Sequence, residues 1–172
     1  MAHNSSVRIL TAGYGNRGFE GFLAVLRRHG VTHLVDVRSV PQSSYWEDFR
    51  RERLALLMRD TEIRYIYMGD TLGGVDGSPV LCKVPDSVDL EPLRAEPKLE
   101  LGLRKLMEAA GDPSRKILLM CGCLRPHRCH RSRLLGPALV ARGVELFHLD
   151  EHGEPVSQAQ VEAEAEPQGS LF

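Results

Sequence analysis

Residues Lys116–Leu149, with the sequence KILLMCGCLRPHRCHRSRLLGPALVARGVELFHL, form the stretch that is most informative about the fold. The apolar run Lys116–Met120 predicts a buried strand, and the run Val144–Leu149 predicts a second one. A helical pattern, His130–Arg142, lies between them and stops at Gly143. Two strands joined by a helix of this length are typical of a right-handed crossover in a parallel sheet.

The same alternation of strands and helices extends toward the N-terminus. Further strands are expected at Val7–Gly13, His33–Arg38 and Arg64–Met68, and helices at Phe19–His29, Trp46–Asp60 and Lys98–Ala110. The segment Gly69–Pro92 is punctuated by Gly and Pro, which predicts a long loop. We therefore expect a single α/β domain with a mainly parallel five-stranded sheet and helices on both faces.

The composition is that of an ordinary globular domain. The chain has 172 residues, of which 42% are hydrophobic and 26% charged. No apolar run approaches the roughly 20 residues that a membrane span needs, and the N-terminus shows no secretory signal pattern. Cys121, Cys123 and Cys129 lie close together, which favours reduced thiols over a disulfide framework. These features predict a cytoplasmic protein without membrane contact.

The charge pattern divides the chain at residue 150. Residues 151–172 hold five acidic residues and no Lys or Arg, so they predict a flexible acidic tail after an α/β domain over residues 1–150. Without the tail the domain is mildly basic, which suits an anionic small molecule or nucleic acid as a partner.

The loop that follows the strand Lys116–Met120 carries the strongest chemical signal. Ligands of parallel sheets bind beyond the carboxyl ends of the strands, where this loop lies. Cys121 and Cys129 are candidate nucleophiles, because a helix start and nearby cations lower the pKa of a thiol. His130 is the candidate proton carrier, and Arg131 a candidate ligand for an anionic group.

Two other interpretations of the cysteines remain open. Cys121 alone could be a small core residue at the end of a strand. Zinc or iron could be held by Cys121, Cys123 and Cys129 together with His127 or His130. However, the spacing C-x-C-x5-C-H does not match the usual paired zinc motifs, so no metal or other cofactor is expected. The phosphatase pattern of Cys, five residues and Arg is not met.

Several motifs together resemble the bacterial and archaeal proteins grouped as domain-of-unknown-function family 488. They are TAGYGNR at 11–17, VDVRSVPQS at 35–43, YIYMGDTLGG at 65–74, and Cys121 with CHRS at 129–132. The resemblance covers residues 9–149 and implies functional positions at Asn16, Arg17, Asp36, Arg38, Cys121, Cys129, His130 and Arg131. Cys123 stands where the family often has an acidic residue. Because the family has no settled activity, the resemblance implies a location more than a function.

Two pairs of polar residues near the first strands are candidate binding groups. Asn16 and Arg17 follow the first strand within Gly13–Gly18, a literal G-x-G-x-x-G, which we discount as a nucleotide site because Arg17 would crowd the turn. Asp36 and Arg38 alternate with valines, so both point to one face of their strand. We expect Asp36 to form a structural ion pair, and Arg38 to face the cysteine loop and bind the anion with Arg131.

The last five residues, QGSLF, resemble the pentapeptide with which bacterial DNA-processing proteins bind the sliding clamp. Gln168 would supply an amide for hydrogen bonding, and Leu171 and Phe172 would supply two apolar anchors.

Two functions are therefore predicted. The leading hypothesis is a cysteine-dependent enzyme, or degenerate enzyme, that acts on a phosphate- or nucleotide-like substrate. The alternative is a DNA-associated accessory protein that the tail recruits to the sliding clamp, with the cysteine cluster as a structural metal or redox element.

Overall fold

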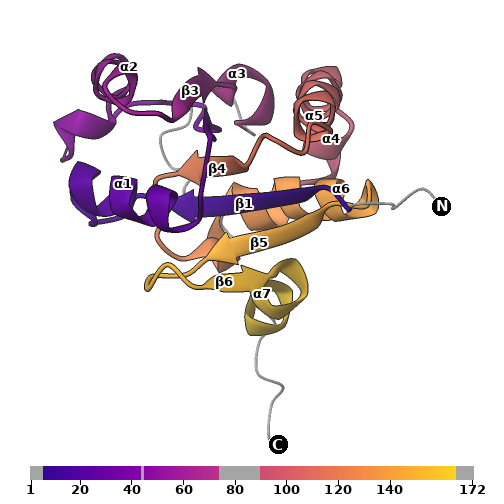
Figure 1. Cartoon of the computed structure of the whole chain (residues 1–172). Coiled ribbons are helices and arrows are strands. Elements are labelled where there is room, and N and C mark those ends of the chain that lie inside the picture. Colours follow the sequence, from indigo (N-terminus) through magenta and orange to yellow (C-terminus); the bar gives the residue numbers. More distant parts are fainter. Residues whose placement is uncertain (1–5, 44, 74–89, 166–172) are drawn as a thin grey trace, which may run out of the picture.

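A sheet with the strand order β3-β2-β4-β1-β5-β6 forms the centre of the molecule (Figure 1). This computed structural model describes residues 6–43, 45–73 and 90–165. The strands are β1 (Arg8–Gly13), β2 (His33–Asp36), β3 (Arg64–Tyr67), β4 (Ile117–Cys121), β5 (Glu145–Leu149) and β6 (Pro155–Ser157). The pairs from β3 to β5 are parallel, and β6 is antiparallel to β5.

Helices cover both faces of the sheet. One face packs against α1 (Gly18–Arg28), the short 3-10 turn η1 (Glu47–Phe49) and α2 (Arg51–Arg59). The other packs against α3 (Gly69–Leu72), α4 (Glu91–Arg94), α5 (Pro97–Ala110) and α6 (Gly136–Ala141). Because β4 lies between β2 and β1 and is buried on both faces, all its residues are apolar. Its Leu118 and Met120 face α1, whereas Leu119 and Cys121 face α5.

The predicted α/β class and the mainly parallel sheet are confirmed, and a sixth strand corrects the expected number. The segment predicted as a flexible tail from residue 151 also differs, because its first part folds onto the sheet. Asp150 caps a tight turn by accepting hydrogen bonds from the amides of His152 and Glu154, and β6 then pairs with the edge of β5. Helix α7 (Gln158–Ala165) follows and buries Val161.

Two other segments differ from the sequence-based expectation. The predicted long loop Gly69–Pro92 begins with α3 and reaches into α4, while its residues 74–89 lie outside the described part. The predicted helix His130–Arg142 opens as a π-helical segment, η3 (Arg131–Leu135), before α6. Such π-turns are rare and often accompany functional sites.

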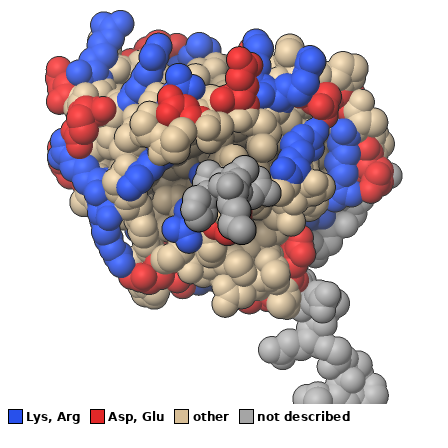
Figure 2. All heavy atoms as spheres, turned by 45° about the vertical axis from the view of Figure 1, so that its right-hand side comes forward, with Lys and Arg blue, Asp and Glu red and all other residues tan. Residues whose placement is uncertain are grey.

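The lengths of the helices and the distribution of charge on the surface complete the description of the fold. No helix there is both long and apolar enough to cross a membrane. Figure 2 shows basic and acidic side chains interspersed over one face of the molecule.

The docking of α7 gives a stability prediction. Val161 is 1% exposed, so Val161→Ala should lower the free energy of unfolding by about 2 kcal/mol through lost burial and an unfilled cavity. Urea denaturation measures this, with Glu164→Gln on the exposed side of α7 as the matched control. Equal stability of the two variants would contradict the docking of α7 as part of the core.

Candidate functional site

The candidate site lies where β4 ends and its following loop turns against β1. The pairing of the two strands continues into this loop, because the amide of Tyr14 donates to the carbonyl oxygen of Cys121 at 3.0 Å. Gly13 makes the contact close, since a Cβ there would lie 1.6 Å from the carbonyl oxygen of Cys123. The loop thus needs glycine at the end of β1, and it is held against the carboxyl edge of the sheet by backbone hydrogen bonds.

Three thiols converge inside this loop. The Sγ atoms of Cys121 and Cys129 are 3.3 Å apart, and those of Cys121, Cys123 and Cys129 all lie within 4.8 Å of one another. Cys121 and Cys129 are 1% and 0% exposed, and Cys123 is half-buried. The cysteines are not in disulfides. The spacing C-x-C-x5-C therefore gathers three sulfurs at one point within the core rather than along a surface.

His130 completes the cluster with one ring nitrogen. Its Nδ1 lies 3.9 Å from the Sγ of Cys121 and 3.8 Å from that of Cys129. Its Nε2 lies 3.1 Å from the carbonyl oxygen of Val37, which can only accept, so Nε2 carries a proton and Nδ1 faces the sulfurs. Burial lowers the pKa of His130, but hydrogen bonds to Cys121 and Cys129 raise it, and the net shift is upward.

Arg131 fixes the loop from within the core. Its side chain is fully buried, and its Nη1 donates to Thr11 Oγ1 of β1 at 2.9 Å. Its Nη2 donates to the carbonyl oxygens of Cys123 at 2.9 Å and Leu124 at 3.3 Å. Within the described part of the chain no carboxylate pairs with this guanidinium. Arg131 is thus a structural cation that positions the backbone around Cys123.

A chain of polar side chains extends from Arg131 to α7. Thr11 Oγ1 lies 2.6 Å from Nδ1 of His148, whose Nε2 contacts Oε1 of Gln158. Because Nε2 of Gln158 donates to the carbonyl oxygen of Ser132, its Oε1 accepts from His148. His148 is therefore held neutral, and burial, with the charge of Arg131, lowers its pKa to about 4. The sequence alone did not reveal this network, because its members come from β1, β5 and α7 and share no motif.

The expected convergence of Arg38 with Arg131 does not occur. The guanidinium of Arg38 forms a bidentate ion pair with Asp36 at 2.8 and 2.9 Å and lies 5.4 Å above the ring of Tyr14. Tyr14 belongs to the α1 side of the sheet, whereas Arg131 bonds Thr11 on the α5 side. The shared anion site is therefore corrected: strand alternation placed Asp36 and Arg38 together, but on the face opposite Arg131.

The other predicted binding residues are also dispersed. Arg17 donates through Nη2 to the carbonyl oxygen of Asp150 at 2.6 Å, and Asn16 is exposed in the turn after β1. The glycine turn packs against the cysteine loop, since a Cβ on Gly15 would lie 2.8 Å from Leu124 Cβ. A pyrophosphate would need this space. The partner-binding candidates Gln168, Leu171 and Phe172 lie outside the described residues.

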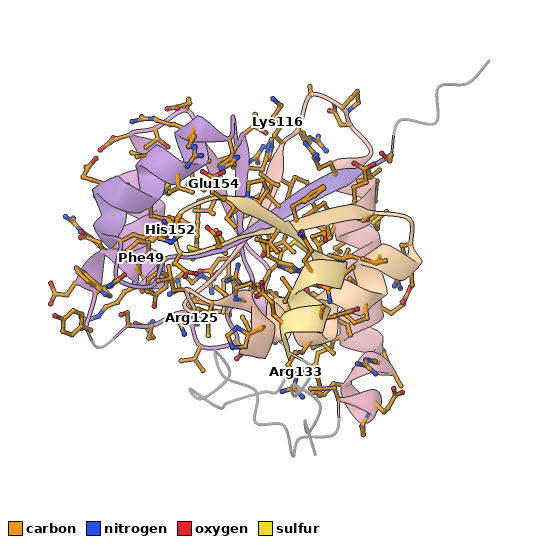
Figure 3. The ribbon with its side chains drawn as sticks, turned by 90° about the horizontal axis from the view of Figure 1, so that it is seen from below. Phe49, Lys116, Arg125, Arg133, His152 and Glu154 are labelled. Atoms are coloured by element: carbon orange, nitrogen blue, oxygen red, sulfur yellow. The ribbon has the colours of Figure 1, made fainter. Side chains whose placement is uncertain are left out.

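The fold and the site define an α/β protein with a buried thiol–imidazole cluster at the carboxyl edge of its sheet. Figure 3 shows Arg125, on the cysteine loop, and Lys116, just before β4, at opposite ends of the molecule.

The chain belongs to the family described as domain of unknown function DUF488, whose model matches residues 18–136. The match includes Cys121, Cys123, Cys129 and His130. No curated protein and no solved structure matches the chain.

The neutral state of His148 predicts a pH-dependent stability. The pKa of His148 is about 4 in the folded chain, whereas an ordinary histidine has a pKa of 6.5. Between these two values the imidazole is protonated in the unfolded state and neutral in the folded state. The stability that His148 contributes should be complete above pH 6.5 and fall between pH 6.5 and 4, by up to about 3 kcal/mol. Urea denaturation at a series of pH values measures the slope. His148→Asn should flatten it, with His152→Asn as the matched control, and an unchanged slope in His148→Asn would contradict the assignment.

Proposed function

We propose that the chain is a metal-binding protein in which Cys121, Cys123, Cys129 and His130 hold a thiophilic divalent cation of the zinc class. One observation carries the proposal: three sulfurs lie within 4.8 Å of one another, and one imidazole nitrogen faces two of them. The sequence spacing alone had favoured a site without metal. The geometry favours the opposite conclusion, because the turn Pro126–Arg128 folds the third thiol back onto the first.

The separations suit tetrahedral coordination. Zinc–sulfur bonds of about 2.3 Å place two tetrahedral sulfur ligands about 3.8 Å apart, and a sulfur and a nitrogen ligand about 3.6 Å apart. The sulfurs of Cys121 and Cys129 are 3.3 Å apart, and all three sulfurs lie within 4.8 Å of one another. Nδ1 of His130 lies 3.9 and 3.8 Å from the sulfurs of Cys121 and Cys129. The three sulfurs are therefore close enough to share one ion, and Nδ1 of His130, which faces two of them, would be the fourth ligand.

The surroundings of His130 also resemble those of a metal ligand. Metal-binding histidines usually donate their second ring N–H to a carbonyl oxygen or a carboxylate, which fixes the tautomer and the ring orientation. The carbonyl oxygen of Val37 does this for Nε2 of His130, leaving Nδ1 as the free donor atom. An imidazole held in this way loses little conformational freedom when it binds the ion.

Charge balance gives independent support. Three thiolates, one neutral imidazole and a divalent cation carry one net negative charge, which is costly to bury alone. The buried guanidinium of Arg131 follows His130 in the chain and bonds the carbonyl oxygen of Cys123. Because the described residues offer Arg131 no carboxylate partner, a metal thiolate cluster would supply the missing countercharge. The set of four protein ligands is closed, which is typical of structural rather than catalytic zinc.

A second candidate function keeps the cysteines as nucleophiles. His130 Nδ1 faces the thiols of Cys121 and Cys129, so it could accept a proton from either and leave a thiolate. Both thiols are nearly fully buried, however, so a substrate could reach them only if the loop moved. Arg131 is engaged in the core and would not serve as the anion ligand of such an enzyme. The presence of metal distinguishes the two candidates.

The metal proposal predicts about one zinc-class ion per chain in protein purified without chelator, measured by elemental analysis of the purified protein. Cys129→Ser and His130→Ala should each lower the metal content and the thermal midpoint. His127→Ala is the matched control, because His127 lies on the same loop but outside the cluster. Its metal content should equal that of the unchanged chain.

Alkylation of the native protein provides the contrasting outcome. With metal bound, the thiols of Cys121 and Cys129 should react slowly with iodoacetamide, and chelation should accelerate the reaction. Protein that holds no metal, and in which one of these thiols reacts faster than free cysteine near neutral pH, would overturn the metal proposal and favour the nucleophile.

A further inference from the structure

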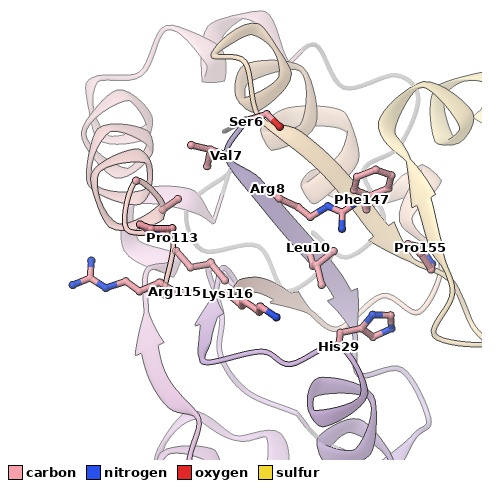
Figure 4. Close-up of a pocket in the computed structure, with 13 residues that line it drawn as sticks. Ser6, Val7, Arg8, Leu10, His29, Pro113, Arg115, Lys116, Phe147 and Pro155 are labelled. Carbon is pink, nitrogen blue, oxygen red and sulfur yellow. The ribbon is translucent and has the colours of Figure 1, made fainter. Parts of the chain in front are cut away.

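A hollow of about 340 Å³ lies at the edge of the sheet opposite the cysteines (Figure 4). It is lined by residues that precede or begin β1 and β4, and by the end of α1. The hollow exists because α1 ends at Arg28 and Gly30 turns the chain away with a φ of 66°. The amino-terminal part of β1 therefore has no helix above it on this face, as Figure 1 shows.

The lining combines an apolar floor with cationic side chains. Leu10 of β1 and Phe147 of β5 remain half-buried and point into the space that α1 leaves open (Figure 4). Arg8 lies over the Phe147 ring, with its Cζ 4.6 Å from the ring centroid, and Lys116 extends toward Leu10. The lining contains no Asp or Glu. The hollow thus favours a ligand that is apolar over most of its surface and negatively charged at one end.

The two cations differ in how far other groups neutralise them. Arg8 approaches Glu145 at 3.9 Å, but both side chains are more than half exposed, so the pair is weak. Lys116 has no ion pair within the part of the chain that the structure describes, and its Nζ lies near Gly30. Arg115 also lines the hollow, but its guanidinium points away from the space and approaches Asp112 at 3.6 Å. Arg8 and Lys116 are therefore the cations available to a ligand.

We propose that this hollow binds a small organic anion, with an aromatic or aliphatic body over Leu10 and Phe147 and a carboxylate, sulfonate or phosphate at Arg8 and Lys116. Its volume lies at the lower end of the 300–1,000 Å³ that is usual for small-molecule pockets. The site is separate from the metal-binding cluster, and neither depends on the other. Because both cations are exposed to solvent, binding should be weak and should decrease with salt.

Anilinonaphthalene sulfonate is a suitable probe, because it joins an apolar ring system to one anionic group and fluoresces in apolar surroundings. We expect the native chain to bind it with a Kd on the order of 10 to 100 µM. Lys116→Gln and Arg8→Gln should each weaken binding roughly five- to tenfold, about 1 to 1.4 kcal/mol. Arg115→Gln removes a charge from the same edge and should change the Kd by less than about twofold, since its side chain points away.

The uncharged N-phenylnaphthylamine separates the anion from its apolar body. It should bind more weakly than the sulfonate, and Lys116→Gln should not affect it. Equal binding of the charged and uncharged probes, or equal effects of Lys116→Gln and Arg115→Gln, would overturn the proposal. Circular dichroism and metal content, measured on each variant, distinguish loss of this site from loss of the fold or of the metal centre.

Discussion

The buried guanidinium of Arg131 is the interaction on which the carboxyl edge of the molecule depends. It bonds β1 through Thr11 and the cysteine loop through the carbonyl oxygens of Cys123 and Leu124. Leaving a guanidinium in the core without these acceptors would cost several kcal/mol, so the loop, β1 and Arg131 hold one another in place. The same cation balances the charge that a metal thiolate cluster would bring, which links the fold of the loop to the proposed function.

The sequence predicted the five parallel strands because each reads as a short run rich in aliphatic or aromatic residues, although β3, at the edge of the sheet, is only half-buried. It did not predict β6 and α7, for a physical reason. The acidic residues of α7 are exposed, β6 has only three residues, and few side chains, such as Val161 and Gln158, face the core. The sequence of α7, QAQVEAEA, differs little in hydrophobicity from one face of the helix to the other, so it carries no helical pattern and resembles a tail. The sequence also does not show that β5 has an unpaired edge for β6 to cover, because that edge exists only in the assembled sheet.

For the site, the sequence predicted where the cysteines and His130 lie, and the chemistry that they perform stays a proposal. The rule that ligands bind beyond the carboxyl ends of parallel strands pointed to the loop after β4, where Cys121, Cys129 and His130 do meet. Period-two alternation put Asp36 and Arg38 on one face, but it could not say that Arg131 lies on the other. Spacing also could not show that the sulfur of Cys123 lies within 4.8 Å of the other two, because the turn at Pro126–Arg128 that brings Cys129 back is not visible in the sequence.

The central claim is that three sulfurs and one imidazole nitrogen share one ion. X-ray absorption at the zinc edge of the metal-loaded protein tests it most directly, since it counts ligands by element. The account predicts about three sulfur neighbours at about 2.3 Å and one nitrogen at about 2.0–2.1 Å, with the nitrogen lost in His130→Ala. A shell of oxygen and nitrogen without sulfur, or an unchanged spectrum in His130→Ala, would contradict it.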